Sequence, residues 1–374
     1  MARSKVGRER PHARPNRKQR ALYGLLLVLL ALFPGSLTTA GASVESSPPL
    51  GVAPYATPQR LSAPTNQEYD VFVYLPLVIR APAGLYVDPT SRSASRAFFD
   101  DHYRTSEGVP AGWTGDHATC GAGSTSEAFR EAILQRINYF RAMAGLPGNV
   151  DFDPSYNEKA QAAALIMSAN GDLSHTPDPG WACYSAAGVE AAGKSNLYLG
   201  RYGPDAITGY MKDPGAGNGA AGHRRWILYP RQEALGTGDV PPVAGYASSN
   251  ALYVLGTFGE RPEPRDGFVA WPPPGYVPYP VVFPRWSFSY PNADFSGAGV
   301  AMSSGGSSIS VVLEALGSGY GDNTLVWRPY AMDSYASWPQ PTADITYTVE
   351  ISNVLISSSA YTFTYDVIVF DPAS

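Results

Sequence analysis

Two histidines stand in segments that could form a polar or metal-binding site. His175 lies in "GDLSHTP", and His223 lies in "AGHRRWILYP", after a glycine-rich run that begins at Asp213. Two imidazoles and a carboxylate from separate segments can bind one divalent ion, and imidazole suits zinc. The same three residues can equally line a polar cleft that holds no metal. The spacing leaves both interpretations open.

Two other chemistries have little support in the sequence. The chain has no G-x-S-x-G segment, which marks the nucleophilic serine of many hydrolases. The run "GAGNGAAGH" lacks the lysine of a phosphate-binding P-loop and follows a predicted helix, whereas a P-loop follows a strand. The sequence therefore assigns no catalytic residue and leaves open whether the protein is an enzyme.

The charge distribution argues against a nucleic-acid partner. The whole chain carries a formal charge of −5 and its first twenty residues carry +7, so the remainder carries −5 − 7 = −12. An acidic chain lacks the basic face that phosphate binding requires. Its 374 residues are too many for one ordinary core and predict two domains.

The basic start of the chain has the pattern of a signal peptide. It precedes the 13-residue apolar run Ala21–Phe33, followed by Pro34 and the small-residue triplet Ala40–Ala42. The run is shorter than the roughly 20 residues that span a bilayer. We expect a secreted protein or one on the extracellular surface, with an uncleaved N-terminal anchor as the alternative.

The chain has two cysteines, Cys120 and Cys183. An even number of cysteines in an exported protein predicts a disulfide, which here would be worth roughly 4 kcal/mol in the chain-entropy model. Two free thiols are the alternative. The absence of C-x-x-C spacing in the sequence argues against a cysteine metal site.

The hydrophobic periodicity predicts helices first and strands later. Ser124 and Glu127 have capping-box spacing ahead of a helical stripe, and Asp153-Pro154 begins a second helix that ends near Gly171. A third helix is expected from Pro204. Strands are predicted at "ALGTGDV" and "ALYVLGTF", and then at "SISVVLEAL", "NTLVWRP", "ITYTVEISNVLI" and "YTFTYDVIVF".

These elements predict an α+β fold in two domains. The expected division is a signal peptide at 1–42, a linker and N-terminal extension at 43–118, a first domain at 119–260, a Pro/Gly-rich connector at 261–282 and a β-sandwich at 283–374.

The first domain resembles the CAP superfamily of cysteine-rich secretory and pathogenesis-related proteins, in its bacterial branch. The similar segments are "LQRINYFRAMAGL" with Asn138 and Arg141, "DFDPSYNEKAQAAALIM", "LSHTP", "SNLYLG", "GHRRWILYP" and "ALGTGDV", in that order. The resemblance implies an α-β-α sandwich with a central antiparallel sheet and an open cleft, followed here by an immunoglobulin-like β-sandwich.

In this family, two histidines and two acidic residues line the cleft and sometimes hold zinc or another divalent ion. His175 and His223 match the histidines. Ser195 stands where the family has the Glu of G-E-N, and Asp213 stands near the second acidic position. Glu190 could replace the missing Glu only through a loop shift. The resemblance therefore implies at most a weakly bound zinc on His175, His223 and Asp213.

The resulting hypothesis is an extracellular binding or interaction module. Its cleft, including Glu190, Ser195 and Asn196, would take a lipid, glycan or peptide, and the sandwich would attach the protein to a cell surface or wall. One alternative is a metal-assisted, protease-like hydrolase that uses His175 and His223. Another is an architectural surface protein with a relic site.

Overall fold

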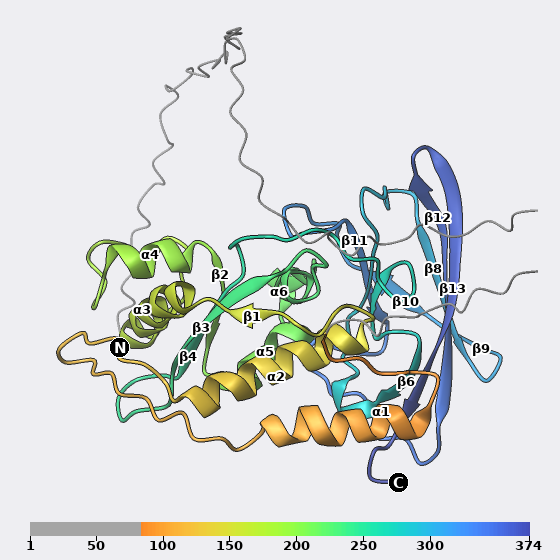
Figure 1. Cartoon of the computed structure of the whole chain (residues 1–374). Coiled ribbons are helices and arrows are strands. Elements are labelled where there is room, and N and C mark those ends of the chain that lie inside the picture. The colour runs from red at the N-terminus through yellow and green to blue at the C-terminus, as the bar shows by residue number, and fades with distance from the viewer. Residues whose placement is uncertain (1–83) are drawn as a thin grey trace, which may run out of the picture. The chain divides into compact units, whose positions relative to one another are not determined.

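Residues 84–374 are described by the computed structural model (Figure 1). The predicted signal peptide at 1–42 and the first part of the predicted linker lie outside the described residues. None of the helices between residues 84 and 374 could span a lipid bilayer. The described chain is helical with one small sheet up to about residue 255 and is built from strands afterwards, which confirms the predicted α+β class.

The N-terminal part contains six α-helices and three shorter helical turns among the described residues. They are α1 (Arg92–Phe98), η1 (Phe99–Tyr103), η2 (Arg104–Ser106), α2 (Glu127–Met143), α3 (Pro154–Asn170), α4 (Ala186–Ala192), α5 (Gly203–Lys212), η3 (Ala216–Asn218) and α6 (Gly222–Ile227). Its sheet has the order β1-β3-β4-β2, from β1 (Asp151–Phe152), β3 (Ala234–Val240), β4 (Ser249–Tyr253) and β2 (Ser195–Leu199). All pairs are antiparallel except β1 with β3.

The N-terminal caps of α2 and α3 were both predicted from the sequence, and one of the two predictions is confirmed. The side chain of Asp153 accepts hydrogen bonds from the backbone N–H groups of Ser155 and Tyr156, so the predicted start of α3 is confirmed. The predicted cap of α2 at Ser124 is wrong. Ser126 caps this helix and accepts a hydrogen bond from the N–H of Phe129, because Ser126 has the extended backbone of an N-cap.

Helices cover both faces of the sheet (Figure 1). Small apolar residues of α3 and α4, with Val240 and Ala251 of the sheet, form one buried cluster, and the opposite face belongs to the main core with α2 and α5. The helix α3 lies close to the sheet, since a Cβ on Gly238 would collide with the backbone of Ala160. Gly238 of "ALGTGDV" and the alanines of "AQAAAL" therefore both allow α3 to lie close to the sheet.

The C-terminal part consists of two sheets. One has the order β10-β11-β7-β5 and the other β6-β13-β12-β8-β9. The strands are β5 (Val269–Trp271), β6 (Gly275–Pro278), β7 (Trp286–Ser289), β8 (Gly299–Ser304), β9 (Ser307–Ile309), β10 (Val311–Leu313), β11 (Thr324–Pro329), β12 (Ile345–Ile356) and β13 (Ser359–Phe370), with a short turn η4 (Tyr279–Val281). Each predicted strand after residue 282 coincides with one or two of these strands.

The Pro/Gly-rich segment 261–282 does more than connect the two parts. It contributes β5 to one C-terminal sheet and β6 to the other. Trp271 of this segment is fully buried, and its ring centroid lies 5.1 Å from that of Phe140 in α2. The described residues thus belong to one compact unit with a shared apolar core. The domain boundaries remain predictions.

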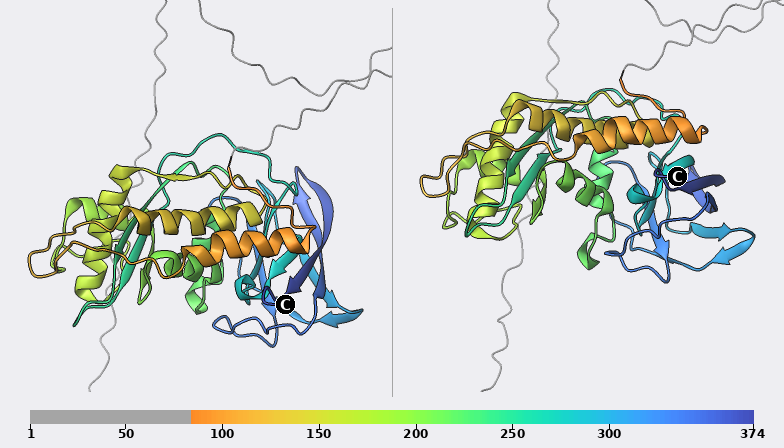
Figure 2. Two further views of the ribbon diagram at one scale, coloured as in Figure 1. Left: turned by 60° about the horizontal axis from the view of Figure 1, so that its bottom comes forward. Right: turned by 90° about the horizontal axis from the view of Figure 1, so that it is seen from below.

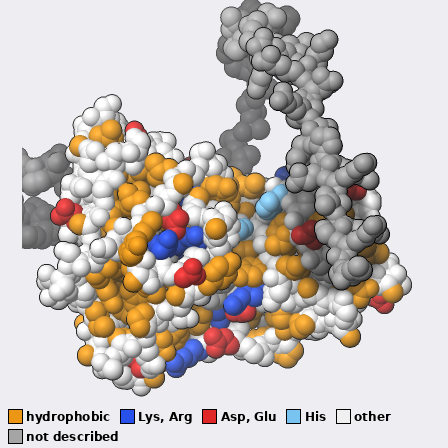
Figure 3. Space-filling view, turned by 180° about the vertical axis from the view of Figure 1, so that it is seen from behind, with side chains coloured by type: hydrophobic (Ala, Val, Ile, Leu, Met, Phe, Trp, Pro, Cys, Tyr) orange, Lys and Arg blue, Asp and Glu red, His pale blue; other side chains and the backbone are white. Residues whose placement is uncertain are grey.

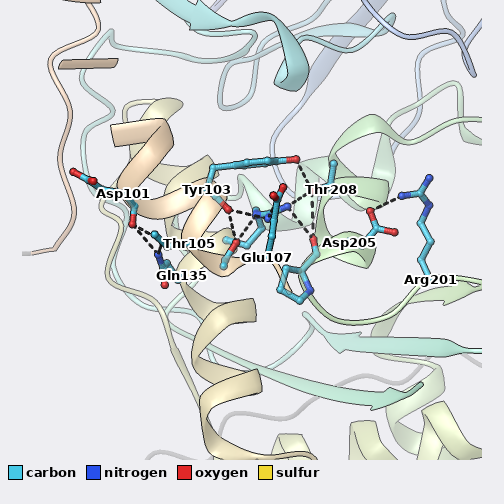
Figure 4. Close-up of polar contacts among 11 residues, drawn as sticks. Asp101, Tyr103, Thr105, Glu107, Gln135, Arg201, Asp205 and Thr208 are labelled. Carbon is cyan, nitrogen blue, oxygen red and sulfur yellow. Dashed lines mark hydrogen bonds and ion pairs between the residues drawn. The ribbon is translucent and has the colours of Figure 1, made fainter. Parts of the chain in front are cut away.

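The segment before α2 runs alongside that helix (Figure 2). It is fastened by Arg136 of α2, whose guanidinium is 2% exposed and lies 3.6 Å from the ring centroid of Tyr103. Arg136 donates hydrogen bonds to the carbonyl of Tyr103 at 2.9 Å, to Ser106 at 2.8 Å and to Thr208 at 2.7 Å (Figure 4). Burial lowers its pKa, and Glu107 at 3.6 Å partly offsets this effect.

We expect Arg136→Lys to lower the free energy of unfolding by about 2–4 kcal/mol, because a lysine cannot keep the forked hydrogen bonds and stacking of a buried guanidinium. Arg201→Lys is the matched control, since Arg201 is 43% exposed and pairs with Asp205 at the surface. Its effect should stay below about 1 kcal/mol. Urea unfolding measures both, and equal losses would contradict the role of Arg136.

Candidate functional site

Two adjoining cavities of about 320 Å³ each open beside the predicted histidines. His175, His223 and Asn218 line both cavities, so the two are parts of one cleft. The structure therefore places both histidines at this cleft. The size is at the lower end of small-molecule sites in proteins.

His175 reaches the cleft from the loop that follows α3. Its Nδ1 lies 2.7 Å from the carbonyl oxygen of Ala192 at the end of α4. Because a carbonyl only accepts, Nδ1 carries the proton and donates this hydrogen bond. In the neutral ring, Nε2 then keeps its lone pair as an acceptor or metal ligand.

His223 is also held through a hydrogen bond from its Nδ1, in this case to the Asp213 carboxylate. Its Nδ1 donates to Asp213 Oδ1 at 2.7 Å, and its backbone N–H donates to Asp213 Oδ2 at 3.0 Å. Asp213 is 1% exposed, so both of its oxygens are directed at one histidine in a buried position. The second hydrogen bond also satisfies a free N–H in the first turn of α6.

The two effects on the His223 imidazole oppose each other. Burial lowers the pKa of His223, whereas the charge and hydrogen bond of Asp213 raise it, and the net pKa lies above its ordinary value. The protonated ring is therefore favoured by folding. Its contribution to stability is present below pH about 6.5 and is lost as the pH rises through the folded pKa.

Left-handed backbone positions shape the loop that carries His223. Asp213 ends α5 with φ of 52°, Gly215 has φ of 100°, and Ala221 precedes α6 with φ of 49°. These angles turn the chain back, so that residue 223 returns to the side chain of residue 213. The glycine-rich composition supplies part of this turn, since glycine adopts positive φ without strain.

Side chains of the C-terminal part fix the same loop from outside. Arg285 is 3% exposed and donates to the backbone carbonyls of Asp213 and, at 2.8 Å, of Gly215. It also pairs with Glu314 at 3.1 Å. Ser334 accepts a hydrogen bond from the N–H of Gly215 at 3.1 Å. Both parts of the protein therefore position the histidine loop.

Ser195 and Asn196 lie at the start of β2 and line one of the cavities. Asn196 is 2% exposed, and its side-chain Nδ2 donates to the backbone carbonyl of His223 at 3.1 Å. The backbone carbonyl of Asn196 accepts a hydrogen bond from the Tyr210 hydroxyl. Ser195 Oγ is buried and has no hydrogen-bond partner within residues 84–374.

Glu190 does not lie where the hypothesis placed it. It lines neither cavity and instead pairs with Lys159 at 2.9 Å and with Lys194 at 3.1 Å. The hydrogen bond from Lys159, followed by that from Lys194, lowers the pKa of the Glu190 carboxyl. The Glu190 side chain points from α4 towards α3. Glu190 therefore does not take the place of the Glu that the family has in its cleft.

The residues do not fit a three-ligand zinc site. No group of three or more His, Cys, Asp or Glu side chains within residues 84–374 is arranged to hold a metal ion. Asp213 supports His223 and uses both oxygens for it, which leaves the Nε2 atoms of His175 and His223 as candidate ligands. Zinc sites in proteins use three or four protein ligands, so two imidazoles fall short of such a site.

Arg224 has a structural role beside the cleft, and the predicted disulfide is present. Arg224 is 0% exposed and donates to the carbonyl of Met211 in α5 and to Ser287 Oγ in β7, so it connects α6 to both parts of the protein. Burial lowers its pKa to about 9. Cys120 and Cys183 form the predicted disulfide.

The sequence analysis missed several cleft residues. Tyr198 and Tyr210 line the first cavity, and Trp226 and Tyr320 line the second. Tyr320 comes from the loop between β10 and β11, about a hundred positions after His223. No spacing signal connects residues so far apart in the chain, and an exposed tyrosine in a Gly/Ser-rich loop has no other marker.

The comparisons with known proteins agree with the geometry of the helical part. Residues 134–255 match the family model "CAP: Cysteine-rich secretory protein family". This match supports a CAP domain over that segment, which carries both histidines and the α-β-α layers. None of the curated proteins matches the chain significantly.

Two solved structures are similar to parts of the chain. One is PcoC, a methionine-rich copper resistance protein from Escherichia coli, with 16% identity, a TM-score of 0.20, and coverage of 27% of this chain and 92% of that one. The other is the selenomethionine form of the same protein, with 14% identity, a TM-score of 0.20, and coverage of 27% and 94%.

We expect Asp213→Asn to lower the pKa of His223, because the substitution removes the carboxylate that raises it and leaves the opposing effect of burial. Titration of the histidine Cε1 protons by NMR measures the shift. Asp172→Asn is the control, since this exposed carboxylate hydrogen-bonds only to the N–H of Leu173. An unchanged His223 pKa in Asp213→Asn would show that the pair is not formed.

Proposed function

We propose that this protein is an exported binding module whose ligand occupies the cleft lined by His175 and His223. The observation that carries the proposal is the fixed orientation of both imidazoles, each held through Nδ1 with Nε2 left available beside the cavities. Uncharged hydrogen-bonding groups such as Asn196 and Asn218 surround them, together with aromatic and apolar side chains. Such mixed linings suit lipids, glycans or peptides.

The extracellular location is part of the proposal. The signal-peptide pattern at 1–42 motivates it, and the Cys120–Cys183 disulfide supports it, because disulfides persist in oxidising compartments. We further assign the CAP domain to the bacterial branch and the C-terminal sheets to an immunoglobulin-like sandwich that attaches the protein to a cell surface or wall. Figure 3 shows acidic and basic side chains side by side on one face, without a wide basic area.

A hydrolase is the second candidate, and the Asp213–His223 pair favours it. A carboxylate that fixes the Nδ1–H tautomer leaves Nε2 able to accept a proton from water. Ser195 is a poor nucleophile in this arrangement, since its Oγ is buried and makes no hydrogen bond to either histidine. Release of dye from labelled casein tests this candidate. Activity that disappears in His223→Ala would establish it.

The binding proposal is tested with three ligand pools: phospholipid vesicles, a neutral oligosaccharide panel and a peptide library. We expect the protein to retain members of at least one pool in equilibrium dialysis read by mass spectrometry. Leu173→Glu should abolish retention, because it places a charge on an exposed leucine that lines the cleft. Leu313→Glu is the matched control, since these leucines are 42% and 44% exposed and only Leu173 lies at the cleft.

Two outcomes would contradict the binding proposal. Retention that is unaffected by Leu173→Glu would place the ligand elsewhere on the protein. No retention from any pool, together with an intact thermal melt, would favour the architectural role.

A further inference from the structure

The C-terminal part supplies one wall of the second cavity. Gly319 and Tyr320 lie in the loop between β10 and β11, and they face Ser195, Asn196 and His223 across this cavity. The cavity therefore does not belong to the CAP domain alone. A residue of the β-rich part contributes a contact surface to any ligand bound beside the histidines.

Tyr320 is held in place on this wall. Arg225 lies over its ring, with the guanidinium carbon 5.3 Å from the ring centroid. Arg225 also donates to the loop carbonyls of Gly317 at 2.9 Å and Asp322 at 2.8 Å. A Cβ on Gly222 would lie 2.9 Å from the ring of Tyr320, so glycine at 222 permits the close approach. Nevertheless 38% of the tyrosine surface stays exposed.

The chemistry of the cavity points to an uncharged ligand. Among the described residues that line it there is no carboxylate, and its one ammonium group, Lys194, pairs with Glu190 at 3.1 Å. The other polar groups include the imidazoles of His175 and His223 and the amide of Asn218, and the imidazole of His223 already pairs with Asp213 at 2.7 Å. A charged ligand would therefore find no unpaired opposite charge in this cavity, because Lys194 and His223 each already have a carboxylate partner.

The aromatic groups in the cavity restrict the chemical class of the ligand further. Tyr320 and Trp226 both line the cavity, so flat apolar surfaces stand beside the amide of Asn218 and the imidazoles of His175 and His223. A pyranose ring combines an apolar face of C–H groups with a rim of hydroxyl groups, which matches this combination. A lipid chain would not use these amide and imidazole groups, and their desolvation would oppose its binding.

We propose that this cavity is a subsite for a neutral saccharide unit and that Tyr320 determines its specificity. The inference rests on the proposed function, because it names the ligand class of the same cleft. Tyr320 supplies the stacking surface, and its rigid attachment through Arg225 limits the entropy lost on binding.

The test uses the whole mature chain and two probes, chitotetraose and cellotetraose, in isothermal titration calorimetry. At least one probe should bind the wild type, and Tyr320→Ala should weaken it by about tenfold or more, whereas Tyr320→Trp should retain binding. Tyr330→Ala is the control, since Tyr330 is 73% exposed on the same part of the protein and lines neither cavity. It should change affinity less than about twofold. Thermal melts of all variants confirm folding.

The outcomes separate this inference from the binding proposal. Saccharide binding that is equally strong in Tyr320→Ala overturns the role of Tyr320, and absence of binding to both probes overturns the saccharide assignment. If vesicles or peptides are retained in a manner that Leu173→Glu abolishes, the binding proposal stands although the saccharide inference fails. If no ligand pool is retained, both fail.

Discussion

The buried carboxylate of Asp213 is the constraint on which the cleft depends. It lies at the end of α5 in a left-handed conformation, accepts two hydrogen bonds from His223, and its backbone carbonyl accepts one from Arg285 of the C-terminal part. A carboxylate that is 1% exposed must have such partners, because burying an unpaired charge is costly. Asp213 therefore links His223, the histidine loop and Arg285 of the β-rich part.

The two parts of the protein also meet through hydrogen bonds at the histidine loop, in addition to their shared core. The histidine loop has few side chains of its own to pack, because it is rich in glycine. Its conformation depends on hydrogen bonds from Arg285 and Ser334, and Arg225 holds the opposite loop that carries Tyr320. The β-rich part thus acts on the cleft directly, in addition to any role in attachment.

Local signals in the sequence predicted local structure well. Asp153-Pro154 marked the start of α3, the alternation in "ITYTVEISNVLI" marked β12, and the cysteine count predicted the disulfide. The pairing of His175 with His223 came from resemblance to a family. The contacts that the sequence did not indicate are tertiary: Glu190 pairs with Lys159 of α3, and the Pro/Gly-rich segment 261–282 supplies β5 and β6 at the edges of the two C-terminal sheets. No sequence pattern marked Tyr320 as a cleft residue, because its position arises from tertiary contacts with Arg225 and Gly222.

Hydrogen–deuterium exchange of the 213–223 segment in Arg285→Lys tests the central claim, that the β-rich part fixes the histidine loop. Arg328→Lys is the control, because Arg328 also pairs with Glu314, at 3.3 Å, but its guanidinium donates its hydrogen bond to the carbonyl of Met332, away from the loop. We predict faster exchange of the loop in Arg285→Lys alone, with β12 and β13 unchanged as an internal standard. Equal loop exchange in the wild type and in both variants would show that the helical part holds His223 without the β-rich part.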